Sequence, residues 1–519
     1  MRPLYLSAMS PPIWRGLTLA LVGVAIISGV SPVAMAFPPS EGTLDSTFGA
    51  TGPGYTIIDF GSGANGHQDG AHRLLRQPDG NFVAVGSVDS AYGFGHVGIG
   101  LTRVLNNGQI DTTFGDGSAP AGRLILQPAA GADITGNGIT FLPDGHLAVV
   151  GTYTPYLSTT TYGELFGFQS DGNGYWDATG IAGSAYNDVL TLPDGRIIVG
   201  GATPGAASSD YALVLYDNAG GLIDHLTVPF DLGGTNNDQA QRITFVSSIN
   251  AASGRLGYVF AIGSVALPNY ASGHQNIECG VVKTGLYTTA PRLRLEPSFG
   301  TGGKRVLDVN TAWSTGQSGA IDGNAYCRGL SVRKDGGLLV AGERYYFGYN
   351  NDHASADDSA GFAAKLDASG AVDPLFHNYG SIGNYAGGFA FYFQQLEYDS
   401  GLYQGLWFSL IQSNGLPLFG GLASLDCDGG VFDPRNRSWV LRTDNAAAQD
   451  ATYSPYFCDA PRSAADTGFD VALDGVFDAG RVVTVGNVFS SLNPGSTTDF
   501  VLMRHYSDLI FTDNFDLGY

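Results

Sequence analysis

Residues 77–86 read QPDGNFVAVG, a tight turn followed by a short apolar stretch that ends in glycine. Proline fixes φ at the first corner of such a turn, aspartate caps the turn through its side chain, and glycine accepts the left-handed conformation. The flanking segments RLLR (73–76) and FVAV (82–85) are typical of short strands. The stretch therefore predicts two strands joined by a turn.

The same pattern returns along the chain. It is clear at 142–151 and 192–201, weaker at 257–263, 334–342 and 479–486, and degenerate at 416–421. The glycines that end the apolar stretch are Gly86, Gly151, Gly201, Gly263, Gly342, Gly421 and Gly486. Their spacing suits one four-stranded antiparallel sheet with loops per repeat, so seven repeats predict an all-β, seven-bladed β-propeller over residues 37–507. We expect these glycines to permit close backbone approach where blades converge.

The two ends of the repeat region each lack a partner. Residues 55–60 (YTIIDF) have the pattern of a strand, but no complete blade precedes them, and few residues follow the strand predicted at 500–506. We expect these two strands to pair, so that the N-terminal strand completes the seventh blade, closes the ring and hides an exposed sheet edge.

A second motif accompanies the turn. GTLDSTFG at 42–49 matches GQIDTTFG at 108–115. Residues 77–86 and 103–115 together resemble the repeat of the Delta-60 family of bacterial exported proteins, and related segments occur at 296–300 and 366–376. The likeness fades across 380–470. The resemblance implies a propeller-like scaffold and offers no catalytic residues to transfer.

Residues 1–36 are typical of a signal peptide. Arg2 and Arg15 precede an apolar run at 17–30, and cleavage is expected after Ala36. The alternative, a membrane anchor, would need an apolar run of about 20 residues. We expect an exported protein, periplasmic or extracellular. Its C-terminal tail, 508–519, resembles the short endings of some Gram-negative exported proteins, with a frayed terminus as the alternative.

The composition limits the partners. Seventy-six glycines and only 14% charged residues agree with an all-β chain rich in turns. After removal of Arg2 and Arg15, the remaining 23 basic and 47 acidic side chains give a net charge of −24. Such a charge disfavours nucleic acid and anionic lipid as partners. The mature chain has no apolar run long enough to cross a membrane, and we expect a monomer.

Local catalytic motifs are missing from the sequence. The mature chain contains no H-E-x-x-H, G-x-S-x-G, phosphate-binding loop or C-x-x-C. The leading interpretation is a non-enzymatic scaffold that presents loops to a protein or glycan. A propeller glycoside hydrolase or lyase stays open, because its carboxylates would converge on the central channel from separate blades. A structural cell-envelope protein is the third alternative.

Two groups of residues are candidates for binding. Asp352, Asp357 and Asp358 could hold Ca²⁺ through clustered carboxylates, but no EF-hand spacing accompanies them and a solvated polar loop is the favoured explanation; no other cofactor is expected. Aromatic residues gather in the fifth and sixth repeats, where a binding surface or simple strand packing would account for them. The aromatic candidates for binding are Tyr345, Tyr346, Tyr349 and Trp407.

Four cysteines in an exported chain predict disulfides. Sequence proximity favours the pairs Cys279–Cys327 and Cys427–Cys458, with free thiols as the alternative. We therefore expect that an alkylating reagent adds no mass to the unreduced, denatured protein and labels four thiols after reduction. A label on any cysteine before reduction would contradict this pairing.

Overall fold

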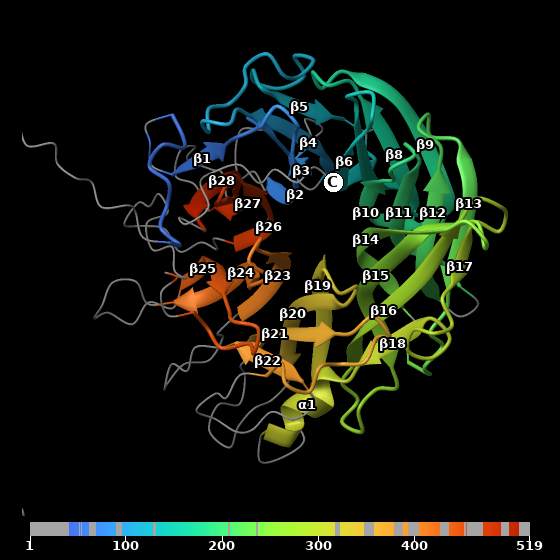
Figure 1. Ribbon diagram of the computed structural model, residues 1–519. Helices are drawn as coiled ribbons and strands as arrows, with labels where there is room; N and C mark the ends of the chain where they lie inside the picture. The colour runs from blue at the N-terminus through green and yellow to red at the C-terminus, as the bar shows by residue number, and fades with distance from the viewer. Residues whose placement is uncertain are drawn as a thin grey trace, which may run out of the picture. The chain divides into compact units, whose positions relative to one another are not determined.

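The computed structural model is almost entirely β-structure (Figure 1). The residues that it describes are 41–50, 52, 54–61, 69–89, 96–127, 131–205, 208–234, 237–316, 322–346, 358–377, 388–392, 404–425, 435–450, 453, 471–488 and 498–507. The chain divides into Met1–Pro38 and Pro39–Tyr519, and all described residues belong to the second unit. No helix among them is long and apolar enough to cross a membrane.

Seven antiparallel sheets form the blades of a closed ring (Figure 1), so the predicted seven-bladed propeller is confirmed. Blade 1 comprises β2 (Gly70–Arg76), β3 (Phe82–Asp89), β4 (Val97–Val104) and β5 (Arg123–Leu126); blade 2 comprises β6 (Asp133–Phe141), β7 (Leu147–Thr154), β8 (Tyr162–Phe168) and β9 (Gly174–Ala182); and blade 3 comprises β10 (Ala185–Thr191), β11 (Ile197–Pro204), β12 (Ser209–Tyr216) and β13 (Leu222–Val228).

Blade 4 comprises β14 (Gln239–Asn250), β15 (Arg255–Leu267), β16 (Asn276–Tyr287), β17 (Leu293–Leu295) and β18 (Lys304–Leu307); blade 5 comprises β19 (Gly323–Val332), β20 (Leu338–Tyr346), β21 (Asp358–Leu366) and β22 (Phe389–Tyr392); blade 6 comprises β23 (Gln404–Ile411), β24 (Pro417–Leu425) and β25 (Arg435–Arg442); and blade 7 comprises β26 (Val471–Asp478), β27 (Arg481–Val488), β28 (Asp499–Tyr506) and β1 (Tyr55–Ile58). In blade 4, β17 and β18 both pair with β16 and divide the fourth-strand position between them. A short helix, α1 (Val309–Gly316), follows β18.

Every anchor glycine lies on the second strand of its blade, including the degenerate copy at Gly421. Opposite each one, the first strand carries a β-bulge. In blade 2, for example, Gly151 pairs with Gly136 and Val150 pairs with Gly138, so Asn137 is left without a partner. The seven bulge residues are His72, Asn137, Asn187, Gln241, Arg328, Trp407 and Leu473.

The bulge explains why the motif ends in glycine. A Cβ atom on Gly151 would lie less than 3.0 Å from the carbonyl oxygen of Thr135, two positions before the bulge residue. The corresponding oxygen crowds each of the other six anchor glycines in the same way. The close backbone approach is therefore within one blade, and not between converging blades as the sequence suggested, because the bulge pushes the first strand toward the second.

The predicted closure of the ring is confirmed. β1 pairs antiparallel with β28, from Tyr55 opposite Met503 to Ile58 opposite Phe500. Further along β28, the buried carboxylate of Asp45 accepts hydrogen bonds from the guanidinium of Arg504 and the hydroxyl of Tyr506, each at 2.8 Å. Chain segments from both ends of the fold thus complete blade 7.

The second motif makes the same two contacts in four blades, an ion pair and a buried aromatic ring. Its aspartate pairs with a cation on the third strand, and its aromatic side chain, three residues later, is buried. The four sets are Arg103, Asp111 and Phe114; Lys365, Asp373 and Phe376; Arg442, Asp450 and Tyr453; and Arg504, Asp45 and Phe48. The fourth set draws its aspartate and aromatic residue from the N-terminal segment, so the copy at 42–49 belongs structurally to blade 7.

Apolar side chains fill the spaces between neighbouring blades. One buried cluster joins Phe82 of blade 1 to Phe500 of blade 7, and another joins Phe260 of blade 4 to Phe362 of blade 5. Strands covered on both faces explain why the second strands are apolar at nearly every position.

The predicted Cys279–Cys327 disulfide is present. It links β16 in blade 4 to β19 in blade 5, with Cα atoms 5.2 Å apart, and both residues are buried. A covalent bond therefore joins two neighbouring blades. Cys427 and Cys458 lie outside the described residues.

Replacing an anchor glycine should destabilise the fold. We expect Gly151→Ala to lower the free energy of unfolding by about 3 kcal/mol, the upper end of the usual cost of overpacking, because its Cβ would meet backbone that cannot move aside. Gly174→Ala is the matched control, since a Cβ there meets nothing within 4 Å. Urea unfolding followed by circular dichroism measures both variants, and equal midpoints would refute the steric explanation.

Candidate ligand site in the central channel

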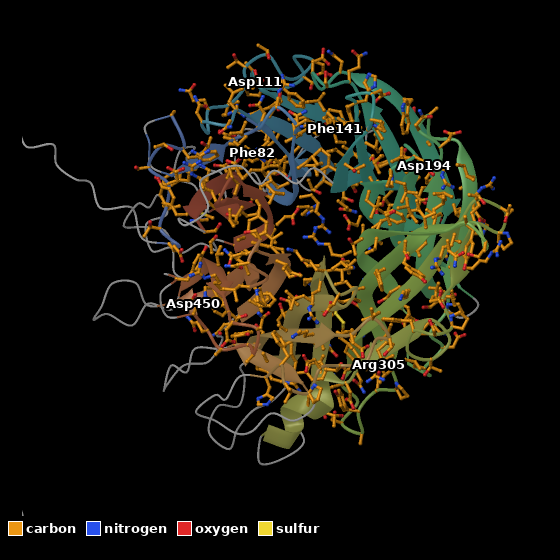
Figure 2. All side chains as sticks on the ribbon, viewed as in Figure 1. Phe82, Asp111, Phe141, Asp194, Arg305 and Asp450 are labelled. Carbon is orange, nitrogen blue, oxygen red and sulfur yellow. A yellow bond between two sulfur atoms is a disulfide. The ribbon has the colours of Figure 1, made fainter. Side chains whose placement is uncertain are left out.

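One bulge residue from each blade faces the central channel. A β-bulge leaves its extra residue outside the ladder and redirects the side chain. All seven bulge residues, together with Arg73 and Arg242, line a cavity of about 230 Å³. Figure 2 shows side chains with nitrogen atoms reaching into the centre of the ring. The repeat thus builds a polar cavity from one position of each blade.

The bulge side chains of blades 1 to 3 are linked to the next blade by hydrogen bonds. His72 Nδ1 lies 2.7 Å from the carbonyl oxygen of Gly136, Asn137 Nδ2 donates to Tyr186 O at 2.8 Å, and Asn187 Nδ2 donates to Ala240 O at 2.8 Å. Each accepting carbonyl belongs to the residue just before the next bulge. Burial lowers the pKa of His72, so the imidazole is neutral and its Nδ1 carries the proton.

Arg73 and Asp188 connect blades that are not neighbours. Arg73 Nε of blade 1 lies 3.5 Å from Asp188 Oδ1 of blade 3, and Asp188 Oδ2 accepts the Ile243 amide of blade 4 at 2.9 Å. Arg73 also donates to the carbonyl oxygens of His72 and Gln241. Burial, and then repulsion from Arg242, lower the pKa of Arg73 to about 10, so the side chain stays charged at neutral pH.

Arg242 and Asp474 repeat this arrangement from the other side of the ring. Arg242 Nη2 of blade 4 donates to Asp474 Oδ1 of blade 7 at 3.0 Å, and Asp474 Oδ2 accepts the Leu74 amide of blade 1 at 3.0 Å. The two ion pairs, together with the two hydrogen bonds from the Leu74 and Ile243 backbone amides, form a closed cycle through blades 1, 3, 4 and 7. We call these four side chains the channel cycle: Arg73, Asp188, Arg242 and Asp474.

The wall on the side of blades 5 and 6 combines a cation with aromatic rings. Arg328 Nε and Nη2 donate to Glu343 Oε1 at 3.0 and 2.7 Å, while the Tyr345 hydroxyl donates to Glu343 Oε2 at 3.4 Å. The guanidinium carbon of Arg328 lies 5.5 Å from the ring centre of Tyr326 and 5.4 Å from that of Trp407. Arg328 is thereby held in one orientation, with Trp407 beside it in the wall.

The aromatic residues singled out in the sequence are placed as follows. Trp407 lines the cavity, and Tyr345 supports the wall through Glu343. Tyr346 ends β20, and its side chain lies outside the described residues, as does the whole of Tyr349.

Sequence reasoning missed six of the seven bulge residues. A positional signal existed: His72, Asn137, Asn187, Arg328 and Trp407 all precede their anchor glycine by 14 residues. The side chains at these positions differ in type, and nothing in the sequence pattern distinguishes them from ordinary strand residues when the bulge is not known. The regular repeats therefore contribute to the cavity as much as the irregular fifth and sixth repeats do.

The lining of the channel bears on whether the protein is a scaffold or an enzyme, and it fits neither of the simple patterns. Small residues would have favoured a scaffold, and paired carboxylates beside a basic group would have favoured an enzyme. Among the described lining residues there is no carboxylate; Asp188, Asp474 and Glu343 lie behind the lining, each paired with an arginine that does line it. The arrangement is a polar wall whose cations are held in place from behind.

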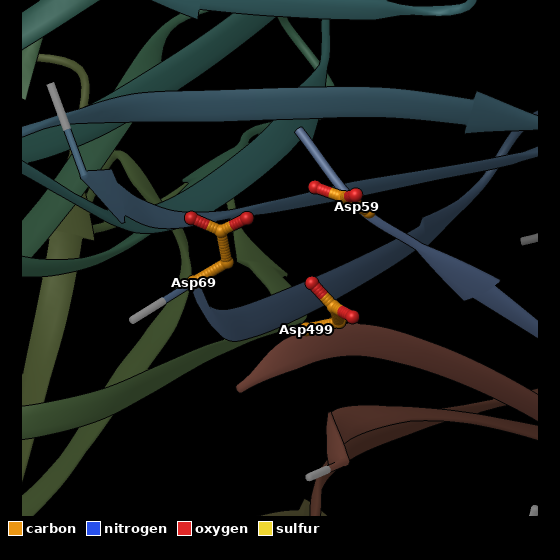
Figure 3. Close-up of side chains that lie close together, drawn as sticks. All are labelled: Asp59, Asp69 and Asp499. Carbon is orange, nitrogen blue, oxygen red and sulfur yellow. The ribbon is translucent and has the colours of Figure 1, made fainter. Parts of the chain in front are cut away.

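Three carboxylates meet where the ring closes (Figure 3). Asp59 follows β1, Asp69 precedes β2 and Asp499 begins β28, and their oxygens lie within 4.8 Å of one another, close enough to share a cation. Arg123 on β5 interacts electrostatically with all three. The calcium candidates from the sequence are not part of this group: Asp352 and Asp357 lie outside the described residues, and only the backbone of Asp358 is described, at the start of β21.

Asp69 also has a structural role. It accepts the amides of Phe60, after the last strand of blade 7, and of Asp89, at the end of β3. Asp238 makes the same two contacts at the start of blade 4, with the amides of Phe230 and Ala266. An aspartate at this position fastens the outer strand of the preceding blade to the second strand of its own blade, with or without a cation.

Comparisons with known proteins assign no family to the chain. No protein-family model matches the chain, and no curated protein matches it in sequence. Among solved structures, it is similar to an ulvan lyase described as a new family of polysaccharide lyase, with 11% identity over 87% of this chain and 96% of that one and a TM-score of 0.44. It is also similar to a protein of unknown function from Dyadobacter fermentans, with 10% identity over 87% and 99% of the two chains and a TM-score of 0.39.

The β-propeller domain of a protease from Pyrococcus furiosus is a third similar structure, with 9% identity over 88% of this chain and 97% of that one and a TM-score of 0.36. These proteins differ in function, and the likeness is too low to carry any of their activities over. The class that the chain itself defines is a seven-bladed β-propeller with a polar cavity in its central channel.

The acidic group predicts a pH dependence. Burial, with repulsion from Asp499 and Asp59, raises the pKa of Asp69 to about 7. An acid whose pKa is raised on folding loses stability as the pH rises from its unfolded value, about 4, toward 7. We expect Asp69→Asn to remove this loss, so the variant gains up to about 4 kcal/mol over the wild type between pH 4 and pH 8, at 1.36 kcal/mol per pKa unit.

Urea unfolding of both proteins across this pH range measures the gain. The difference between the two is the relevant quantity, because Glu278, whose pKa burial raises to about 8, gives both proteins a shared pH dependence. If the asparagine fails to replace a hydrogen bond of Asp69, the free energy of unfolding of the variant falls by the same amount at every pH. The change of the difference with pH is unaffected. A difference that stays constant with pH would show that Asp69 is ionised throughout.

Proposed function

We propose that the protein is an exported, non-enzymatic propeller that binds a glycan in the cavity of its central channel. The observation that carries this proposal is the lining itself: an indole beside a guanidinium, surrounded by amide and imidazole groups from other blades. Sugars present hydroxyl groups that both donate and accept hydrogen bonds, and apolar faces that pack on aromatic rings. A mixed polar cavity with one tryptophan suits both properties.

The size of the cavity limits what it can hold. At about 230 Å³ it is smaller than the roughly 300–1,000 Å³ of sites for drug-sized ligands. A single sugar residue is a suitable occupant, whereas several linked residues are not. We infer that the protein recognises a free sugar or one residue at the end of a glycan chain.

Binding without turnover is the better supported form of this function. The carboxylates nearest the cavity are each paired with a guanidinium and also accept either a backbone amide or the hydroxyl of Tyr345. A carboxylate held in this way is a poor general base, because its proton-accepting oxygens are already bonded. The lyase or hydrolase alternative therefore has to rely on other groups, and the binding experiment also tests it.

Replacing Trp407 should weaken glycan binding. We expect the wild-type protein to bind a subset of a glycan array, and Trp407→Ala to lose about fivefold in affinity, since packing on an aromatic ring is worth about 1 kcal/mol. Trp176→Ala on β9 is the matched control, because it removes an indole outside the cavity. A thermal unfolding experiment on each variant checks that it is folded.

Two results would contradict the proposal. If Trp407→Ala bound the selected glycans as tightly as the wild type, the cavity would not be the site. If bound glycans were cleaved on prolonged incubation, as seen by mass spectrometry, the protein would be an enzyme of the hydrolase or lyase class.

A further inference from the structure

We propose that the sugar residue held in the channel is a sugar acid, whose carboxylate contacts Arg242 and Arg328 and whose hydroxyl groups face His72, Asn137 and Asn187. This inference rests on the proposed glycan binding and specifies the class of ligand. It follows from where the unbonded guanidinium nitrogens and the unbonded acceptor atoms lie around the cavity, as the contacts of the lining residues show.

The cations in the lining favour an anionic ligand. Three guanidinium groups border the cavity, and the three acids paired with them stand behind, outside the lining. The acids balance the charge of the folded protein, but they also hold each guanidinium in a fixed orientation. A ligand that enters the cavity therefore meets the cations first, in a protein whose overall net charge is −22.

Two of the three guanidinium groups have a nitrogen that makes no hydrogen bond to the described residues. Arg73 uses Nε, Nη1 and Nη2 for Asp188, His72 O and Gln241 O. Arg242 uses Nε and Nη2, for Arg328 O, Leu473 O and Asp474. Arg328 uses Nε and Nη2 for Glu343. Among the described residues, Nη1 of Arg242 and Nη1 of Arg328 make no hydrogen bond, so these two groups can receive a carboxylate.

Arg242 and Arg328 are also close to each other. Arg242 Nε donates to the backbone carbonyl of Arg328 at 3.1 Å, so the Arg242 side chain reaches the strand that carries Arg328, and both side chains line the same cavity. A planar carboxylate matches two guanidinium donors better than a neutral hydroxyl does, because charge-assisted hydrogen bonds are roughly twice as strong as neutral ones.

The part of the wall formed by blades 1 to 3 offers acceptors. His72 Nδ1, and one of the two amide N–H groups of both Asn137 and Asn187, are already bound to backbone carbonyls of the next blade. The second N–H of each asparagine can still donate to a ligand oxygen. Each side chain then has an acceptor left: the imidazole Nε2 and the two amide Oδ1 atoms. Acceptors repel a carboxylate and bind hydroxyl groups. A simple inorganic anion would satisfy only the arginine side, whereas a polyhydroxy acid satisfies both.

The test is isothermal titration calorimetry with single sugars at pH 7. Glucuronate and galacturonate are the acidic probes, glucose and galactose the neutral ones, and glucose 6-sulfate carries a different anion. We expect a uronate to bind at least tenfold more tightly than its neutral counterpart and than the sulfate ester, and this preference to shrink as the salt concentration rises.

Variants assign the effect to the cavity. Arg328→Gln should weaken uronate binding at least tenfold and leave the weaker binding of the neutral sugar nearly unchanged. Arg328→Lys keeps the charge without the planar fork, so its affinity for uronate should lie between those of the wild type and the glutamine variant. Arg196→Gln is the matched control, since Arg196 pairs only with Asp194 in an exposed turn of blade 3.

The outcomes separate this inference from the proposed function. Equal affinity for uronates and neutral sugars, or unchanged uronate binding in Arg328→Gln, would overturn the sugar-acid assignment while glycan binding stands. Binding of glucose 6-sulfate as tight as that of the uronates would overturn the preference for a carboxylate. If no sugar binds and the array is also blank, the proposed function itself fails. Should Arg328→Gln not fold, the lysine variant and the salt dependence decide the question.

Discussion

The structure depends on one steric constraint, the presence of a backbone carbonyl oxygen where the anchor glycine would carry a Cβ atom. Gly86, Gly151 and the five other anchors can occupy this place only because they have no side chain. The first strand can then bulge toward the second, and its extra residue leaves the hydrogen-bonded ladder. One constraint, repeated seven times, shapes the inner edge of every blade and directs seven side chains into the channel.

Charged pairs then hold strands together within blades and, in the centre, join one blade to another. Within single blades, aspartates of the second motif bind third-strand cations, and in blade 7 the pair of Asp45 and Arg504 joins the two ends of the fold. In the centre, the channel cycle links blades 1, 3, 4 and 7. Because each carboxylate of the cycle also accepts a backbone amide, its charge is satisfied in a buried setting where an unpaired charge would be costly.

The same contacts prepare the cavity for a ligand. Arg242 and Arg328 are fixed by acids behind the wall, and His72, Asn137 and Asn187 are fixed by carbonyls of neighbouring blades. Little side-chain freedom is left to lose on binding, which favours affinity in a small site. Since each blade supplies one position, chemistry can vary around the ring without any change in the scaffold, and this explains how His, Asn, Gln, Arg, Trp and Leu occupy equivalent places.

The architecture could be predicted from the amino-acid sequence: the turn motif and its glycines indicated the seven blades, the unmatched strand at 55–60 indicated the closure with 500–506, and proximity predicted the Cys279–Cys327 bond. These features are local or repeated, so they can be read along the chain. The cavity could not be read in this way, apart from Trp407. The cavity forms only in the folded ring, because the bulge residues are far apart in sequence and become neighbours when seven bulged strands converge on one axis.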